Sequence, residues 1–277
     1  MSKTASIRSV NWHLISACNY SCKFCFARNL GEKPVPYSEG LEILKRLHEA
    51  GMEKINFAGG EPLLHPHIFD YCHEAHDLGM VVSVTTNGSK LTEKLVHENR
   101  RHIDWIGLSV DSACEDTEIL LGRGRGGHVG HCTEISDAIR EAEIRLKINT
   151  TVTALSWMEN MGNFIRRVNP DRWKVFQMLH IKGENDDAVP WLSITDSQFD
   201  YFKNNHKKVI LKNSTGPVFE FADMMESSYF MLTPGGKVKT DTGRVITKFQ
   251  LEAVLHRGVS NYVFEDQYFG RGGVYAW

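Results

Sequence analysis

Three cysteines crowd into eight residues near the start of the chain, in the stretch Cys18-Asn19-Tyr20-Ser21-Cys22-Lys23-Phe24-Cys25. Because three and then two residues separate them, their thiolates can converge on one metal centre from a single loop. Zinc normally takes a fourth Cys or His, and the spacing leaves His13 or a distant cysteine open for that place. A [4Fe–4S] cluster held by three cysteines instead leaves one iron free for a substrate or cofactor. The isolated cysteines are expected to be small core side chains: Cys72, Cys114 and Cys132.

The composition is that of an ordinary globular chain. Its 277 residues are 42% hydrophobic and 24% charged, and the formal net charge of −2 argues against a nucleic-acid partner. No run of 18 apolar residues occurs, so no membrane partner is expected. The first residues lack the apolar core of a secretory signal, and six cysteines in so long a chain do not form a disulfide framework. We therefore expect a cytoplasmic location.

Strand-like and helix-like segments alternate over the first 206 residues. Six such units in a row predict parallel strands joined by right-handed crossovers, which is an α/β fold. The expected strands are 10–16, 53–57, 80–86, 104–110, 144–152 and 172–179, and the expected helices are 38–50, 66–78, 91–99, 132–142, 157–168 and 196–205.

The alternation of strand-like and helix-like segments does not continue in residues 207–277. We interpret this part as a C-terminal extension that caps the active site. Residues 229–232 and 237–240 are expected to pair as a hairpin, because Thr233-Pro234-Gly235-Gly236 is typical of a turn. A short helix is expected over 250–256, followed by a glycine-rich tail.

The cysteine loop resembles that of the radical S-adenosylmethionine superfamily. The aromatic Phe24 precedes the third cysteine, the loop follows the first strand, and Gly59-Gly60-Glu61-Pro62 stands after the second strand. The resemblance implies a partial (β/α)6 barrel and a [4Fe–4S] cluster at Cys18, Cys22 and Cys25, whose open iron takes S-adenosylmethionine. It also implies that an electron from a reductase or flavodoxin-like donor releases a 5′-deoxyadenosyl radical.

Within that superfamily the chain is similar to the viperin family of antiviral nucleotide-modifying enzymes. The similarity spans about residues 11 to 277 and includes Asn169-Pro170-Asp171-Arg172-Trp173-Lys174-Val175-Phe176-Gln177 and Arg271-Gly272-Gly273. Ala58 replaces the serine of the animal sequences, and their N-terminal amphipathic helix is missing. The cofactor-binding residues expected from the motifs and this similarity are Phe24, Gly59, Gly60, Glu61, Asn87, Ser109 and Arg123.

Strand parity predicts where the substrate lies. Residues two apart on a strand face the same way, so each of several strands carries a polar face that includes a cation or an amide. If these faces point inward, lysines, arginines and asparagines converge on one cavity, and a polyanion such as a triphosphate neutralises them. The expected substrate-binding residues are Asn11, Lys54, Asn56, Lys147, Asn149, Arg172 and Lys174, with Arg271 from the extension.

The activity that the resemblance implies is dehydration of a nucleoside triphosphate to its 3′-deoxy-3′,4′-didehydro analogue, a chain terminator. CTP or UTP is favoured and GTP remains open. The departing 3′-hydroxyl needs a proton, for which Tyr229, Lys239 and Arg244 are the candidates. Two other interpretations stay open at this point: another radical reaction such as peptide maturation, and a zinc-binding interaction module.

Overall fold

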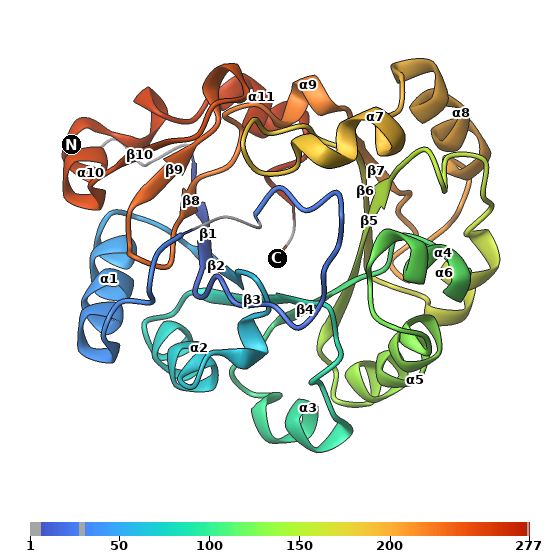
Figure 1. The fold of residues 1–277 in the computed structure, drawn as a ribbon. Coiled ribbons are helices and arrows are strands. Elements are labelled where there is room, and N and C mark those ends of the chain that lie inside the picture. The colour runs from blue at the N-terminus through green and yellow to red at the C-terminus, as the bar shows by residue number, and fades with distance from the viewer. Residues whose placement is uncertain (1–6, 28–30, 276) are drawn as a thin grey trace.

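A computed structural model of the chain describes residues 7–27, 31–275 and 277. Its described strands form one sheet of ten in the order β10-β9-β8-β1-β2-β3-β4-β5-β6-β7, which curves into an open ring (Figure 1). The strands from β8 to β7 run parallel, whereas β9 is antiparallel to both of its neighbours. The strands are β1 Ser9–His13, β2 Lys54–Ala58, β3 Val81–Thr86, β4 Trp105–Ser109, β5 Arg145–Val152, β6 Arg172–Gln177, β7 Val218–Glu220, β8 Met231–Leu232, β9 Val238–Thr240 and β10 Thr247–Phe249.

The helices cover the outside of the ring (Figure 1). The α-helices are α1 Tyr37–Glu49, α2 Ile68–Asp77, α3 Glu93–Asn99, α4 Glu115–Leu121, α5 His128–Glu141, α6 Gly162–Val168, α7 Val189–Leu192, α8 Asp196–His206, α9 Ala222–Met225, α10 Leu251–Arg257 and α11 Glu265–Gly270. Four short 3-10 helices join them: η1 Pro62–Leu64, η2 Asp186–Ala188, η3 Thr242–Arg244 and η4 Val259–Asn261. Among the described residues, no helix combines the length and apolar character needed to cross a membrane.

The two faces of each strand differ in chemistry, as the parity argument predicted. On β1, Val10 and Trp12 are fully buried in the hydrophobic core between sheet and helices. Asn11 and His13 alternate with them and line the interior of the ring. The interior is therefore polar where barrel interiors are usually filled with Val, Ile and Leu. This inversion leaves room for a charged ligand.

The partial-barrel prediction is confirmed, because β7 and β10 form the two edges of a sheet that does not close. The 229–240 hairpin is confirmed as β8 and β9, and β8 also pairs with β1. Among the described residues, six short α-helices and strands were not predicted: α4, α7, β7, α9, β10 and α11. Residues 207–277 add strands to both edges of the sheet, so they share one sheet with residues 1–206.

Candidate functional site

One large cavity, of about 720 Å³, fills the interior of the ring. Most of the residues predicted from the sequence line it: Asn11, Cys18, Cys22, Phe24, Cys25, Lys54, Asn56, Gly59, Gly60, Asn87, Ser109, Arg123, Lys147, Asn149, Lys174, Tyr229, Lys239 and Arg271. The described lining does not include Glu61, Arg172 or Arg244. The cysteine loop and the converging cations thus face the same space.

The cysteine loop is held between two glycine positions. A Cβ at Gly60 would lie 2.2 Å from the carbonyl oxygen of Ala17, and one at Gly122 would lie 2.3 Å from that of Ser21. The backbone nitrogen of Ser21 donates to the Gly122 carbonyl at 3.1 Å. Only glycine permits such close backbone approach, so both glycines fix the height and tilt of the loop.

The three loop cysteines all line the cavity. A tetrahedral zinc ion with bonds of about 2.3 Å holds its sulfur ligands about 3.8 Å apart. Among the described residues, Cys18, Cys22 and Cys25 do not form a set whose sulfurs all lie within 4.8 Å of one another. One loop presents all three thiols to the cavity, and three cysteine thiols are a donor set that a [4Fe–4S] cluster takes.

Glu61, predicted to bind the cofactor, is not among the described residues that line the cavity and connects two strand ends. Its carboxylate is fully buried and accepts hydrogen bonds from Thr86 Oγ1 at 2.6 Å and from the Asn87 backbone nitrogen at 2.8 Å. The Asn87 amide in turn donates to Asn19 Oδ1 at 2.9 Å, inside the cysteine loop. Glu61 thus connects the end of β2 to the end of β3 and positions Asn87, which does line the cavity.

Arg123 reaches the cavity from the loop after α4. Burial opposes its charge, but Asp111, Cys22 and Glu118 raise the pKa of the guanidinium above its ordinary value. Its Nε donates to Asp111 at 2.5 Å, and the guanidinium carbon lies 5.7 Å from the centre of the Phe24 ring. Burial and the charge of Asp111 raise the pKa of Glu118 to about 8. A permanent cation therefore stands beside the cysteine loop, suited to a carboxylate ligand.

Three lysines from three strands crowd the opposite part of the cavity. Burial and neighbouring cations lower the pKa of Lys54 to about 5, and that of Lys147 to about 7. Burial lowers the pKa of Lys174 to about 8, although Glu220 acts in the other direction. Arg172 lies behind the described lining, where its guanidinium donates to the Gly272 carbonyl and stacks on Tyr275 at 3.9 Å. Burial and mutual repulsion therefore disfavour the charged forms of Lys54 and Lys147, and an anion in this part of the cavity would favour them.

Tyr229 lies at the edge of that cluster. Its phenol donates a hydrogen bond to the carboxylate of Glu220, and the same carboxylate forms an ion pair with Lys174. Burial and the charge of Glu220 raise the pKa of Tyr229 well above its ordinary value, so the phenol keeps its proton. Glu220 was missed in the sequence, because it lies on the unpredicted strand β7.

The other two candidate proton donors lie elsewhere. Lys239 on β9 lines the cavity near His13, which was considered only as a zinc ligand. Arg244 points away, contrary to the prediction: it donates to the Ala222 carbonyl and lies 3.9 Å from Asp241. The reason is local backbone geometry, since Arg244 ends the short helix η3 with a left-handed φ of 61°.

The isolated cysteines were predicted to be small core side chains. Cys72 and Cys132 are buried as expected, but the prediction was wrong for Cys114, which is exposed at the start of α4.

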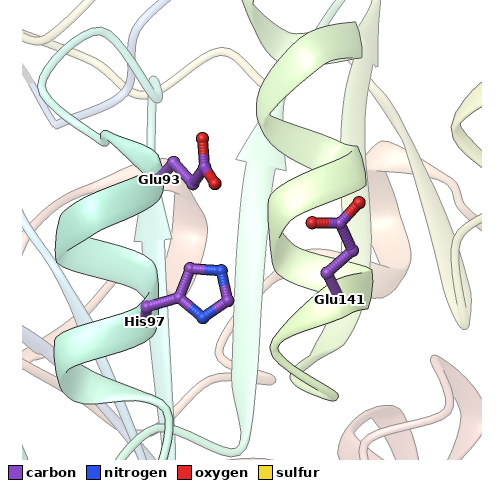
Figure 2. Close-up of side chains that lie close together, drawn as sticks. All are labelled: Glu93, His97 and Glu141. Carbon is purple, nitrogen blue, oxygen red and sulfur yellow. The ribbon is translucent and has the colours of Figure 1, made fainter.

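A second group of possible ligands lies on the outer surface. Glu93 and His97 of α3 face Glu141 of α5 across the gap between the two helices (Figure 2). Their ligand atoms lie within 4.8 Å of one another, both carboxylates are exposed, and the place is empty. Exposed acidic groups often gather in this way, and we assign no site there.

Comparison with known proteins agrees with this geometry. Residues 12–190 match the model of the family described as the radical SAM superfamily. The chain is 39% identical to an "S-adenosylmethionine-dependent nucleotide dehydratase" of Thermoplasmatales archaeon (strain ISO4-H5), over 98% of this chain and 96% of the relative. It is 34% identical to the "S-adenosylmethionine-dependent nucleotide dehydratase RSAD2" of Oncorhynchus mykiss, over 99% of this chain and 82% of that protein.

Solved structures show the same fold. The structure titled "Crystal structure of Streptococcus suis SuiB bound to S-adenosylmethionine" superposes with a TM-score of 0.71 and 16% identity. The alignment covers 95% of this chain and 67% of that one. At this identity the likeness concerns the fold, with its open parallel barrel, and not the substrate.

Proposed function

Because the chain belongs to the S-adenosylmethionine-dependent nucleotide dehydratases of the radical SAM superfamily, we propose that it dehydrates a nucleoside triphosphate to the 3′-deoxy-3′,4′-didehydro analogue. One observation carries the proposal: the three lysines with lowered pKa values share a cavity with the three-cysteine loop. Burial and mutual repulsion disfavour the charged forms of these amines, and the negative charge of a bound anion favours them. A triphosphate supplies that charge.

The cysteine loop would hold the family's [4Fe–4S] cluster through Cys18, Cys22 and Cys25. Arg123 would bind the carboxylate of S-adenosylmethionine, with Gly59, Gly60, Asn87 and Ser109 lining the same region. When bound, the cluster and S-adenosylmethionine supply the 5′-deoxyadenosyl radical that removes the ribose C4′ hydrogen. The electrons come from a reductase or a flavodoxin-like donor, and we place the reaction in the cytoplasm.

The protein's own contribution is orientation and charge neutralisation. Lys54, Lys147 and Lys174 bind phosphate oxygens, and Arg271 approaches from the C-terminal tail. Arg172 supports this end of the cavity through its contacts with Gly272 and Tyr275. The amides of Asn11 and Asn56, joined by a 3.0 Å hydrogen bond, and that of Asn149 line the floor between these cations. These residues would contribute to substrate affinity and would take no part in bond cleavage.

Tyr229 is the group we assign to the departing 3′-hydroxyl. A general acid must carry a proton at working pH and reach the reacting oxygen. The raised pKa of Tyr229 meets the first requirement, and for the second the side chain lines the cavity in contact with Lys174 and Arg271. In this structure the single phenol proton is donated to Glu220, so the 3′-hydroxyl would have to replace Glu220 as its acceptor when the substrate binds.

The test is anaerobic incubation of the reconstituted protein with dithionite, S-adenosylmethionine and each of the four ribonucleoside triphosphates. We expect one or more triphosphates to raise the release of 5′-deoxyadenosine. Mass spectrometry should then find a nucleotide that has lost one water. Deoxyadenosine release that no triphosphate enhances would overturn the nucleotide assignment and leave the superfamily membership intact.

A further inference from the structure

Lys239 is a buried lysine whose Nζ lies 5.8 Å from the centre of the Phe26 ring, beside the cysteine loop. It is only 1% exposed, and its Nζ has no hydrogen-bond partner among the residues that the structure describes. Burial lowers its pKa, while Glu184 and Asp241 act in the other direction. Because the side chain lines the cavity, its donors are available to a ligand there. An unsatisfied buried ammonium is costly, so a ligand that accepts from it gains affinity.

The sheet register places Lys239 in a row of cavity-lining residues. Met231 of β8 pairs with Asn11 of β1 on one side and with Lys239 of β9 on the other. His13 lies two residues further along β1, and its Nδ1 also lacks a partner within the described structure. Burial and Lys239 lower the pKa of His13 to about 3, so its ring is neutral at physiological pH. Two unpartnered polar groups therefore lie together.

This pair is well separated from the phosphate-binding lysines. Three strand-to-strand steps of about 4.8 Å separate β9 from β2, which makes about 14 Å between the backbones of Lys239 and Lys54 in sheet order. Tyr229, two residues before Met231, lines the same cavity and contacts Lys174 and Arg271. A nucleotide with its phosphates on the lysines and its ribose beside Tyr229 has its base left for the rest of the lining, which includes Lys239.

We propose that Lys239 selects the base of the nucleotide and favours uracil over cytosine. A lysine ammonium donates three hydrogen bonds and accepts none. Uracil carries a carbonyl oxygen at the position where cytosine carries an amino group, so the ammonium has an acceptor in UTP and meets a second donor in CTP. A site built to hydrogen-bond one group strongly rejects an analogue that lacks it. The proposal rests on the proposed function, and it names the substrate of the same site.

The experiment compares UTP with CTP, whose bases differ at position 4, a carbonyl against an amino group, and at N3, an N–H donor against an acceptor. Isothermal titration calorimetry on the full chain gives both dissociation constants, and anaerobic turnover gives both kcat/KM values. We expect UTP to be favoured by about tenfold or more. Lys239→Met removes the donors but keeps the length of the side chain. It should bring the UTP-to-CTP ratio to within about threefold of one, whereas Lys239→Arg, which keeps the donors, should retain the preference.

Lys248→Met is the matched control. Lys248 faces Lys239 in the register of β9 and β10, but its Nζ donates to Glu32 at 2.9 Å, and it is not among the described residues that line the cavity. This variant should keep the UTP preference. Folding of the Lys239→Met protein is checked by its melting temperature, which should not fall because a costly buried charge is removed.

The outcomes separate the two proposals. A protein that turns over UTP and CTP equally well, or a Lys239→Met variant that loses both to the same extent, overturns the role of Lys239 and spares the nucleotide assignment. Equal losses would mean that the ammonium serves the ribose, the phosphates or the cofactor. A wild-type chain that binds neither nucleotide overturns the proposed function, and with it this inference.

Discussion

The guanidinium carbon of Arg271 lies 3.5 Å from the centre of the Tyr229 ring. Arg271 is fixed in that position because its Nε and one terminal nitrogen donate to the Ser228 carbonyl at 2.9 and 2.8 Å. The phenol of the same tyrosine donates to Glu220 on β7, at the far edge of the sheet. Tyr229 therefore joins the C-terminal tail, the strand β8 that follows it and the edge strand β7. This arrangement holds the open side of the barrel together where the substrate is expected.

Replacing Tyr229 with Phe tests the proton donor while keeping the ring beneath Arg271. General acid catalysis typically contributes about 100-fold or more, so the yield of dehydrated nucleotide per deoxyadenosine released should fall about 100-fold. The measurement is chromatography of both products from the same anaerobic reaction. The yield ratio is informative because a general loss of folding or of cluster would lower both products together.

Tyr201→Phe provides the control for that substitution. Tyr201 lies on α8, is 48% exposed and contacts Trp157 through its ring. Removing its phenol should leave the product ratio unchanged. If Tyr229→Phe and Tyr201→Phe gave the same ratio as the unmodified protein, another group would have to protonate the leaving hydroxyl.

Glu220→Gln should destabilise the protein, because Glu220 supplies the negative charge that contacts Lys174. Breaking one half of a buried ion pair costs about 3 kcal/mol or more, which lowers the melting temperature of a chain of this size by roughly 6 °C. A triphosphate should restore part of the loss, because a bound ligand stabilises the folded state. Differential scanning calorimetry with and without UTP measures both effects. Glu42→Gln, which breaks an exposed pair with Lys45, should change neither.

The sequence allowed prediction of the parts of the site whose signals are local. The cysteine spacing is one, and the alternation of cations with apolar residues on β2, β5 and β6 is another. Glu220 was not predicted as a site residue, because it lies on a three-residue strand that is too short to show an alternating pattern. Lys239 was predicted as a proton donor to the leaving hydroxyl. That its Nζ lacks a hydrogen-bond partner could be seen only in the folded structure, where β8 and β9 pair. The prediction that Arg244 lies at the active site was wrong, because its left-handed backbone conformation turns the side chain out of the expected direction.

Metal analysis tests the cysteine loop. Alanine in place of Cys18, Cys22 or Cys25 should reduce the iron and sulfide of the anaerobically reconstituted protein from about four each per chain to near zero. Cys114→Ala is the matched control, because Cys114 is an exposed cysteine outside the loop and should leave the iron content as it is. One zinc per chain and no sulfide in the unaltered protein would contradict the cluster assignment.

Proton uptake on nucleotide binding tests the cationic cluster. With pKa values of about 5 for Lys54 and about 7 for Lys147, both amines are largely neutral in the free protein at pH 8. A bound polyanion favours their charged forms and so raises these pKa values. Binding should therefore take up between about one and two protons, and the dissociation constant should rise by up to about tenfold per pH unit for each proton as the pH increases above 7. Titration calorimetry in buffers of different ionisation enthalpy counts the protons, and Lys147→Met should lower the count by about one. Binding that releases protons, or that is independent of pH between 7 and 9, would show that the phosphates do not contact these lysines.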